Sequence, residues 1–473
     1  KQDQENSGGL SMDNSGAENH TTIFTIAESS LDENVIWVGT DDGNVQVTTD
    51  GGQNWTNTVK NISGLPLNTW CYHIEASVHD KKTAYAVFDG HASGDMKAYV
   101  YKTSDFGKTW KSITTNEIEI FARNIQEDYV NPDLLFLGTE FGLYITIDGG
   151  KNWTKFTNKV PSTAIHFIDL QKTTNDLVLG THGRGIIIID DISPLRSINK
   201  QALSKKLHFF ESKTFYMDDQ NGFAGSGGSF GAETQFVGAN PNSGVQIKYL
   251  LSKRHTFGKM SMEIQDMDGK KIISLTPGKS KGLNIVEWYY TIKAPKVAKA
   301  KTFSFGGFAS PRVKAGKYKA VITKGKDTFE HVFEVAYDPK STLSKEDIEL
   351  KQQSVMKLYN LSEELAYIIY KLDTVVDICK KTKTKEALTS LKETLVVTTG
   401  DNYVGSAEPQ LREKVAELYS KIVSSYDKPS AAELDYLAVL SNCFDSSKLE
   451  FEKLLKKAKL KKVEFKSFED FIK

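Results

Sequence analysis

"TIDGGKNW" (Thr146–Trp153) repeats a pattern that occurs earlier in this chain as "TTDGGQNW" (Thr48–Trp55) and "TSDFGKTW" (Thr103–Trp110). In each copy we expect the Asp carboxylate to accept N–H bonds from a tight turn, one Gly to adopt positive φ, and the Trp to cover a sheet edge. The pattern therefore predicts a hairpin between two strands, whose carboxylates serve the turn. The residues with this structural role are Asp50, Gly52, Trp55, Asp105, Gly107, Trp110, Asp148, Gly150 and Trp153.

A second repeated pattern lies upstream of these turns. "GTDDG" (39–43), "GTEFG" (138–142) and "GTHGRG" (180–185) each follow a short apolar run, and "FDGH" (88–91) takes the corresponding place in a fourth copy. Four isoleucines follow "GTHGRG". Because this β-branched run favours a strand, the stretch is a turn between strands rather than a phosphate loop before a helix. Repeats of about 40 to 55 residues built from short strands indicate a β-propeller, with one four-stranded blade per repeat.

Four blades are predicted over residues 21–196, after a lead-in segment at 1–20. In the first blade the strands, A to D, are placed at "IFTIAE", "VIWVGT", "NVQVTT" and "WTNTV". The fourth blade ends at "IIIIDDISPLR" with no clear strand D. Propellers close with roughly four to eight blades, so we expect this segment to be part of a larger propeller. Its other blades would come from an upstream segment, in the same polypeptide or in a separate chain, and Lys1 would be a processed or cut start.

The turns between strands B and C should share one end of the propeller, because neighbouring strands alternate in direction. The hairpins that contain the Asp residues of the first pattern should share the other end. Propellers usually bind ligands at the end that carries the B–C turns and the connections between blades. A solvated polar rim is the alternative for each residue, but polar side chains recur at these turns. The residues predicted to bind a ligand are Asp41, Asp42, Trp70, His73, Asp89, His91, Asp95, Glu140, His182 and Arg184.

Three kinds of chemistry could in principle occur at this rim. A glycosidase needs two carboxylates that flank the sugar bond, and the candidates are Asp42, Asp89 and Glu140. A sialidase needs converging arginines, which are disfavoured because only Arg123 and Arg184 are placed to reach the rim. A metal site would draw on the His and Asp side chains of the same turns, but no fixed ligand spacing supports one. We therefore expect neither a metal nor a cofactor.

The rest of the chain changes character twice. Residues 197–340 are predicted to hold a linker, including the Gly/Ser-rich "NGFAGSGGSFGAE", and an Ig-like β-sandwich whose strands alternate from "VQIKYLL" to "FEHVFEVAYD". Residues 341–473 are predicted to form an α-helical hairpin or bundle. Ser344 and Asp347 form a capping box, and apolar residues then follow at spacings of three and four.

Composition excludes some classes of partner. Lys plus Arg and Asp plus Glu number 60 each, which argues against nucleic acid or an anionic membrane as the main partner. No apolar run approaches the roughly 18 residues of a membrane span. The three cysteines lie far apart in the sequence, so they indicate neither a disulfide framework nor a metal cluster.

The three hairpin patterns resemble the Asp box of BNR-repeat propellers, which occurs in sialidases, xyloglucan-cleaving glycosidases and sortilin/VPS10 propellers. The stretches "IWVGTDDGNVQVTTDGG", "LLFLGTEFGLYITIDGGKNW" and "LVLGTHGRGIIIIDDISPLR" are similar to the end of the propeller region in large exported bacterial proteins of the BNR/sortilin-like type, many of them labelled glycosyl hydrolase. The resemblance implies the C-terminal half of such a protein. It also implies export, to the periplasm, the cell surface or the medium. It says little about chemistry, because Asp boxes lie away from propeller active sites.

The sequence thus predicts a mainly β protein with an α-helical C-terminal part: BNR-type β-propeller blades, an Ig-like β-sandwich and a helical hairpin or bundle. The leading functional hypothesis is a binding protein that holds a peptide or polysaccharide at the propeller rim. The alternative is a glycoside hydrolase whose catalytic carboxylates lie partly outside this chain.

Overall fold

The computed structural model describes residues 14–15, 18–19, 21–217, 244–303, 305–400, 407–458 and 463–472. The chain divides into two compact units, Lys1–Ser204 and Lys205–Lys473. Within the lead-in segment, β1 (Asn14–Ser15) pairs with β2 (Glu18–Asn19). The Gly/Ser-rich stretch predicted as a linker lies outside the described residues. No helix in the described ranges has the length and apolar character needed to cross a membrane.

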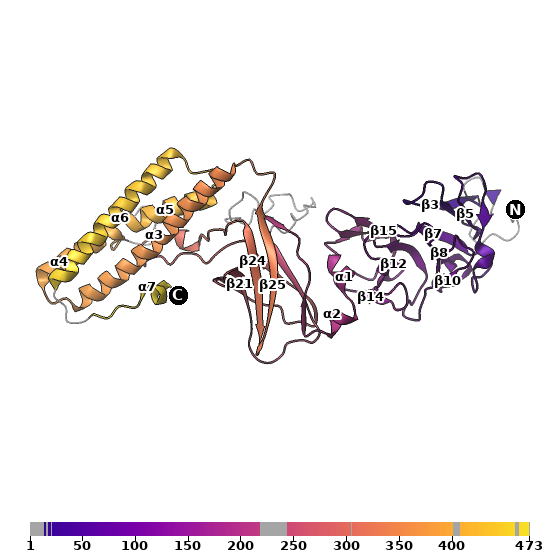
Figure 1. Ribbon diagram of the computed structural model, residues 1–473, viewed down its shortest axis with the longest axis horizontal. Coiled ribbons are helices and arrows are strands. Elements are labelled where there is room, and N and C mark those ends of the chain that lie inside the picture. Colours follow the sequence, from indigo (N-terminus) through magenta and orange to yellow (C-terminus); the bar gives the residue numbers. More distant parts are fainter. Residues whose placement is uncertain are drawn as a thin grey trace. The chain divides into compact units, whose positions relative to one another are not determined.

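Four antiparallel sheets follow one another along the first unit (Figure 1). The first sheet has β3 (Ile23–Glu28), β4 (Ile36–Thr40), β5 (Val45–Thr48) and β6 (Thr56–Asn57), and the second has β7 (Trp70–Ala76), β8 (Ala84–Asp89), β9 (Tyr99–Thr103) and β10 (Lys111–Ser112). The third has β11 (Ala122–Glu127), β12 (Leu135–Thr139), β13 (Gly142–Thr146) and β14 (Thr154–Phe156), and the fourth has β15 (Ile165–Gln171), β16 (Asp176–Thr181) and β17 (Ile186–Ile189). In each sheet the strands pair in chain order, as in the blade of a propeller.

The sheets pack face to face, and the first strand of each contacts the first strand of the next, from β3 through β7 and β11 to β15. A separate apolar core fills each of the three interfaces. Trp37 and Phe88 lie in the first core, Tyr144 in the second and Phe136 in the third, and all four are fully buried or nearly so. Strand residues that alternate between the two faces therefore contribute to two cores, which explains why these strands are apolar along most of their length.

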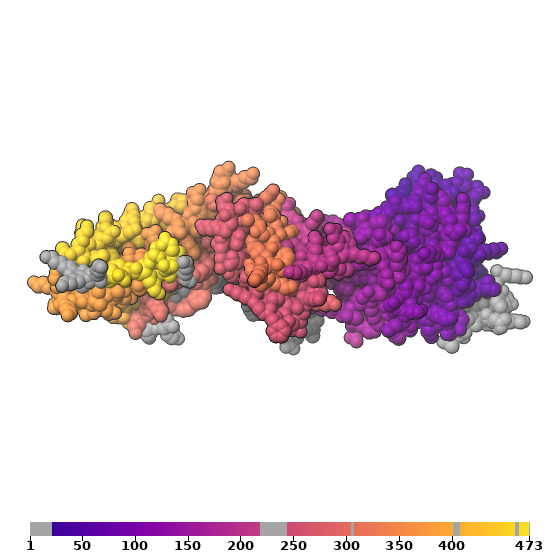
Figure 2. Space-filling view, turned by 60° about the horizontal axis from the view of Figure 1, so that its bottom comes forward, coloured from indigo at the N-terminus to yellow at the C-terminus, as the bar shows by residue number. Residues whose placement is uncertain are grey.

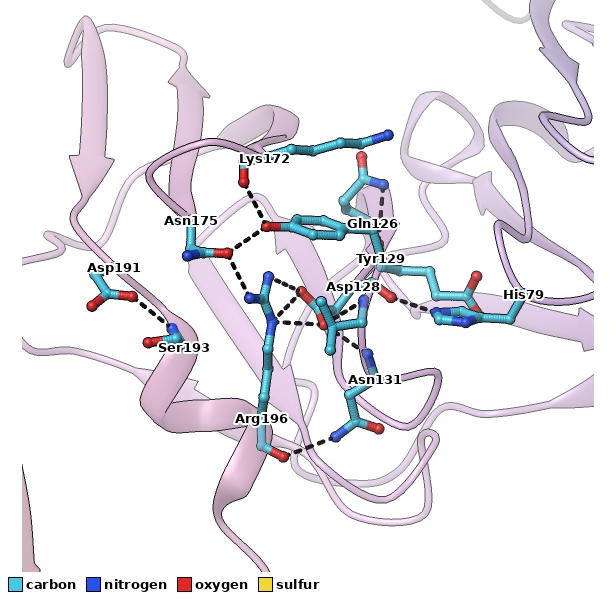
Figure 3. Close-up of polar contacts among 12 residues, drawn as sticks. His79, Gln126, Asp128, Tyr129, Asn131, Lys172, Asn175, Asp191, Ser193 and Arg196 are labelled. Carbon is cyan, nitrogen blue, oxygen red and sulfur yellow. Dashed lines mark hydrogen bonds and ion pairs between the residues drawn. The ribbon is translucent and has the colours of Figure 1, made fainter. Parts of the chain in front are cut away.

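The chain leaves the fourth sheet through α1 (Ser193–Ser197) and α2 (Lys200–Ser204), and Arg196 fastens this exit to the third and fourth sheets (Figure 3). Its Nε and Nη2 donate to the two carboxylate oxygens of Asp128 at 2.7 to 3.0 Å, and its Nη1 donates to Oδ1 of Asn175 at 2.6 Å. The guanidinium lies 4.5 Å from the ring centre of Tyr129. Asp128 is fully buried and also accepts two backbone N–H bonds from its own loop. We call these four residues the clasp.

Two sheets and a group of helices make up the second unit. The smaller sheet has β18 (Leu207–Phe209), β20 (Val245–Leu251) and β23 (Gly282–Trp288), and the larger has β19 (Phe215–Met217), β25 (Asp327–Tyr337), β24 (Gly316–Lys324), β21 (Met260–Asp266) and β22 (Lys271–Leu275). Pairing is antiparallel except between β19 and β25. Both sheets contribute to one core around Trp288, Tyr249 and Phe333. Strands β20 to β25 lie where the alternating pattern predicts them, whereas β18 and β19 lie ahead of that pattern, in the stretch predicted as a linker.

The C-terminal helices are α3 (Lys345–Ile378), α4 (Thr382–Leu395), α5 (Leu411–Ser424), α6 (Ala431–Ala458) and α7 (Phe468–Ile472). Ser344 caps α3 by accepting the N–H of Asp347 at 3.1 Å, as the sequence predicts. Arg412 on α5 donates to the carbonyl of Ala298, and Tyr419 donates to that of Ala309. These bonds join the helices to the segment that follows β23, and Figure 2 shows the sheets and helices of this unit in direct contact. Three short 3-10 helices complete the described elements: η1 (Val59–Asn61), η2 (His91–Ser93) and η3 (Phe305–Phe308).

Candidate ligand-binding rim

Each of the four sheets in the first unit has one irregularity at the same place in its first strand. The pairing of the first and second strands shifts by one residue at this place, and the residues there are Phe24, Tyr72, Arg123 and His166. Such a bulge re-aims a side chain away from the regular alternation of the strand. All four bulges lie toward the end of the sheet that carries the turn between the second and third strands. They therefore present four side chains, one from each sheet, at one end of the unit.

Arg123 is the centre of the contacts at this end. Its Nε donates to Oε2 of Glu140 at 3.2 Å, and its Nη1 donates to Oδ2 of Asp89 at 3.3 Å. The guanidinium also lies 5.1 Å from the ring centre of Tyr72 and 5.0 Å from that of Phe121. The Asp89 side chain is fully buried, whereas 32% of the Glu140 side chain is exposed. Two carboxylates thus hold one guanidinium, and Glu140 is the one that solvent reaches.

His91 begins η2 and extends this network. Its backbone N–H donates to Oδ1 of Asp89 at 2.9 Å, and its ring Nδ1 lies 2.7 Å from the same oxygen. The imidazole stacks on Phe121 with 4.9 Å between ring centres. Because Asp89 engages Nδ1, Nε2 is the ring nitrogen left to meet a ligand.

A second pair of imidazoles lies on the fourth sheet. His166 stacks on His182 with 5.4 Å between ring centres and meets the Tyr72 ring edge to face at 6.4 Å. Desolvation and the nearby positive charge of Arg123 lower the pKa of His166 below its ordinary value. His166 is therefore neutral at pH 7 and can either donate or accept a hydrogen bond there.

Aromatic side chains from the first two sheets complete the group. Phe24 meets Trp70 edge to face at 4.6 Å, and Tyr72 lies 5.2 Å from each of them. Phe24 is exposed and Trp70 half-buried, so part of this aromatic surface is open to solvent. We call the whole connected group the rim cluster: Phe24, Trp70, Tyr72, Asp89, His91, Phe121, Arg123, Glu140, His166 and His182.

Of the predicted rim residues, Asp42 and Asp95 bond within their own loops, and Asp41 bonds the backbone just before β3. Asp41 accepts the backbone N–H of residue 22 at 2.7 Å, and Asp42 accepts the hydroxyl of residue 40 in the same turn. Asp95 accepts the hydroxyl of Tyr99 at 2.7 Å, and that bond lowers the pKa of this carboxyl. Short polar side chains commonly bond their own turns in this way.

Two further predicted residues also lie outside the rim cluster. His73 belongs to the regular part of β7 after the bulge, and its Nε2 lies 3.1 Å from the carbonyl oxygen of Ile125 in the next sheet. Burial lowers the pKa of His73 to about 4, so this imidazole is a neutral packing residue between sheets. Arg184 is exposed in the turn of the fourth sheet, where its backbone N–H donates to the Thr181 hydroxyl.

The Asp-box residues form compact turns at the other end of the sheets. Asp50 accepts the Thr48 hydroxyl at 2.7 Å and the N–H of Asn54 at 2.9 Å, and these bonds lower its pKa to about 2, with the backbone bond from Asn54 the largest cause. Asp105 and Asp148 make the same bonds in their own turns. Their carboxylates are thus saturated by local donors.

The geometry of the carboxylates bears on catalysis. A glycosidase requires one carboxyl that can give a proton and a second that faces the sugar or a water. Asp89 and Glu140 instead both accept bonds from Arg123, and Asp42 accepts a bond in its own turn. The rim cluster is thus organised around a guanidinium rather than around an open carboxylate pair. Across the described residues, no group of three or more His, Cys, Asp and Glu side chains is arranged to hold a metal ion.

The sequence matches no protein-family model and no curated protein. Among solved structures, the chain is similar to Ycf48 bound to a D1 peptide, with 18% identity, a TM-score of 0.26, and coverage of 34% of this chain and 47% of that one. It is similar to a GH74 xyloglucanase from Xanthomonas campestris, with 12% identity, a TM-score of 0.30, and coverage of 67% and 46%. It is also similar to the extracellular domain of a putative hybrid two-component system from B. thetaiotaomicron, with 13% identity, a TM-score of 0.28, and coverage of 68% and 39%. The chain spans less than half the length of each of these three structures, and the likeness, at low TM-score, is to β-propeller proteins.

Proposed function

We propose that the first unit is part of a larger β-propeller that binds an extended peptide or glycan at the rim cluster. The observation that carries this proposal is the repetition of the bulge. Four separate sheets each re-aim one side chain at the same position, and the contacts among these side chains form one connected surface. Packing of the sheets does not require such convergence, because the cores between sheets are built from other residues.

The chemistry of the rim cluster favours a ligand that combines an acidic group with a ring or an apolar side chain. Phe24, Trp70 and Tyr72 provide faces for stacking. Arg123 is the fixed cation, and Glu140, its solvent-exposed partner, is the group that an incoming carboxylate would replace. An acidic peptide and a uronate-containing glycan both meet this description.

The remaining parts of the chain would support this binding role. In the proposal, the two sheets of the second unit form an Ig-like sandwich that acts as a spacer, next to the helical bundle, in an exported protein. An upstream propeller segment would supply the missing blades. Glycoside hydrolysis by a catalytic pair lying partly outside this chain is the alternative activity.

Binding is tested with immobilised Asp/Glu-rich peptides that contain an aromatic residue, and with oligogalacturonate, titrated with the 473-residue chain. His182→Ala should weaken binding roughly 5- to 10-fold, the equivalent of one ordinary hydrogen bond of about 1 kcal/mol. Glu140→Gln should strengthen it, because the variant removes the carboxylate that competes with the ligand for Arg123.

Asp95→Asn is the matched control, because Asp95 is a polar residue of a neighbouring turn that lies outside the rim cluster. If it weakened binding as much as His182→Ala does, the rim cluster would not be the ligand site. If Glu140→Gln abolished binding, Glu140 would contact the ligand itself and would not compete with it for Arg123. Release of reducing ends from a glycan panel, lost on substitution of Asp89 or Glu140, would favour the hydrolase instead.

A further inference from the structure

One position of the third strand distinguishes the fourth sheet from the other three. Register places the same position of the third strand at Val45, Val100, Leu143 and Ile186. Each lies three residues before the third-strand residue that pairs first with the second strand, in the order of the second strand. The first three side chains are 0% exposed because they pack on the next sheet, whereas Ile186 is 72% exposed. Ile188, two residues further, is likewise exposed, and so is Phe167 on β15. The fourth sheet therefore exposes an apolar face, whereas the equivalent face of each of the other three sheets is covered by the next sheet.

The outer edge of β17 is open as well. In the other three sheets a short fourth strand, β6, β10 or β14, pairs with this edge. The N–H of Thr58 donates to the carbonyl of Val45 at 2.7 Å, and that of Ile113 donates to the carbonyl of Val100 at 3.0 Å. The corresponding acceptor in the fourth sheet is the carbonyl of Ile186. Over the ranges that the structure describes, no strand pairs with this edge.

The chain that follows β17 is not placed to fill this edge. The N–H of Ile192 donates to the carbonyl of Asn175 at 2.8 Å, a bond that Gly51, Phe106 and Gly149 also make at the equivalent position of the other sheets. The fourth sheet diverges just after this bond, where the chain enters α1. The guanidinium of Arg196 then binds the Asp128 carboxylate in the clasp (Figure 3). In the three other sheets the same part of the repeat forms the Asp-box turn. After that turn the chain runs back along the outer edge of the third strand as the fourth strand. In the fourth sheet α1 takes the place of that turn, and Arg196 holds this helix to Asp128.

The first sheet is open on its other face. Ile26 on β3 is 62% exposed, whereas Ile74, at the same position after the bulge of β7, is 1% exposed. Trp110 and Trp153 are buried against the preceding sheet, and Trp55, their counterpart in the first sheet, is exposed. Both ends of the row of four sheets thus present surfaces that match those buried at the three internal interfaces.

We infer that the edge of β17 is a strand-acceptor site, filled by an extended segment that belongs to a further blade of the same repeat and lies outside residues 1–473. This inference deepens the proposed function, because it rests on the larger propeller assumed there. The segment would run antiparallel to β17, donate an N–H to the carbonyl of Ile186, and cover the apolar face with alternate side chains.

A second copy of this chain is the less favoured occupant. The first sheet of the second copy has a face that could pack on the fourth sheet of the first copy. That face brings with it no unpaired strand that could pair with β17. The strands described ahead of β3 have two residues each and pair with one another. A second copy would therefore leave the β17 edge unfilled.

The test uses a synthetic peptide of residues 151–160, "KNWTKFTNKV", which contains the outer strand of the third sheet. The control is the same peptide with an N-methyl group on Phe156, the residue that lies opposite Leu143. Amide hydrogen exchange of Ile186–Ile189 is followed in the 473-residue chain. Ile186 and Ile188 should exchange freely in the chain alone, at least fivefold more slowly with the peptide, and unchanged with the methylated control.

Several outcomes would overturn the inference. Slow exchange of β17 at every protein concentration would mean that the chain fills its own edge, and slow exchange that appears only at high concentration would identify a second copy. Equal effects of the two peptides, or none, would mean that the edge accepts no strand. Binding of oligogalacturonate is measured on the same samples. A chain that binds the acidic glycan but not the strand peptide refutes this inference and leaves the rim proposal standing.

Ile186→Lys combined with Ile188→Lys gives a second check. Both side chains are exposed, so melting of the chain should not change, yet the effect of the peptide on exchange should be lost. Leu67→Lys, at an exposed apolar residue of a loop, is the matched control and should preserve the effect. An effect that survives the double substitution contradicts the assignment of the site to β17.

Discussion

Replacing Arg196 with Met should destabilise the first unit selectively. The substitution keeps the length and apolar stem of the side chain and removes the guanidinium. Asp128 then loses its cation, Asn175 loses a donor, and Tyr129 loses the charge above its ring. Because Asp128 is fully buried, its carboxylate cannot regain these partners from water.

The size of the effect follows from these contacts. Removing one partner of a buried ion pair costs about 3–5 kcal/mol. Asp128 keeps two backbone N–H bonds, so the free energy of unfolding should fall by about 3 kcal/mol, near the lower limit. With an m value of about 2 kcal/mol per molar urea, the unfolding midpoint should drop by about 1.5 M. Arg196→Lys keeps the charge but loses the paired bonds, so its loss should be intermediate.

Tryptophan fluorescence is the appropriate assay. Of the 6 tryptophans in the chain, Trp288 alone lies in the second unit, so the emission reports mainly on the four sheets of the first. Far-UV circular dichroism follows the long helices of the second unit and should not shift. The control is Arg184→Met, at an exposed arginine of the fourth sheet, which should change the free energy of unfolding by less than about 0.5 kcal/mol.

If Arg196→Met lowered the free energy of unfolding by less than about 0.5 kcal/mol, the reasoning would be refuted. It would mean that the exit of the chain is not held by the clasp. The argument that this segment cannot return to the β17 edge would then fail with it.

Three further predictions concern other parts of the chain. Asp105→Ala should lower stability by about 1–3 kcal/mol, because turn N–H groups lose their acceptor, without changing rim binding in the glycan titration. Burial and the neighbouring charge of Glu127 raise the pKa of Glu75 to about 8, above its value in the unfolded chain, so its contribution to stability is lost as pH rises from about 4.5 through about 8. Glu75→Gln should therefore melt like the parent at pH 4 and at a higher temperature at pH 8. A thiol reagent should modify Cys443 alone in the folded chain, because the other two cysteines are buried, and all three after unfolding.

The strands could be located from the sequence because their signals are local. The stretch "IFTIAE" coincides with β3, and after "IIIIDDISPLR" the described residues add no fourth strand to β15, β16 and β17. Both predictions rest on the alternation of apolar and polar residues and on residues typical of turns. These signals depend only on neighbours close in the chain.

The rim was harder to predict because its geometry depends on pairing between strands. In "FARNIQ", Arg123 occupies a place that simple alternation assigns to any solvent-facing residue. Its role comes from a one-residue shift against β12, which is visible only once the two strands are paired. For the same reason the sequence pattern does not single out His166 and Tyr72, whereas it does predict Asp89, at the end of β8, and Glu140, directly after β12.

The bulges have a consequence for how binding preference can change. A bulged residue is left out of the pairing, so replacing it leaves the side chains before and after it on their own faces and keeps the two cores of that blade intact. Positions 24, 72 and 166 are thus three variable sites on a constant scaffold, comparable to the loops of a recognition domain but held on strands. Position 123 is constrained, because Arg123 is the cation paired with the buried Asp89 carboxylate. A library randomised at these sites should yield folded proteins with new ligand preferences at high frequency, and natural selection would find the same route.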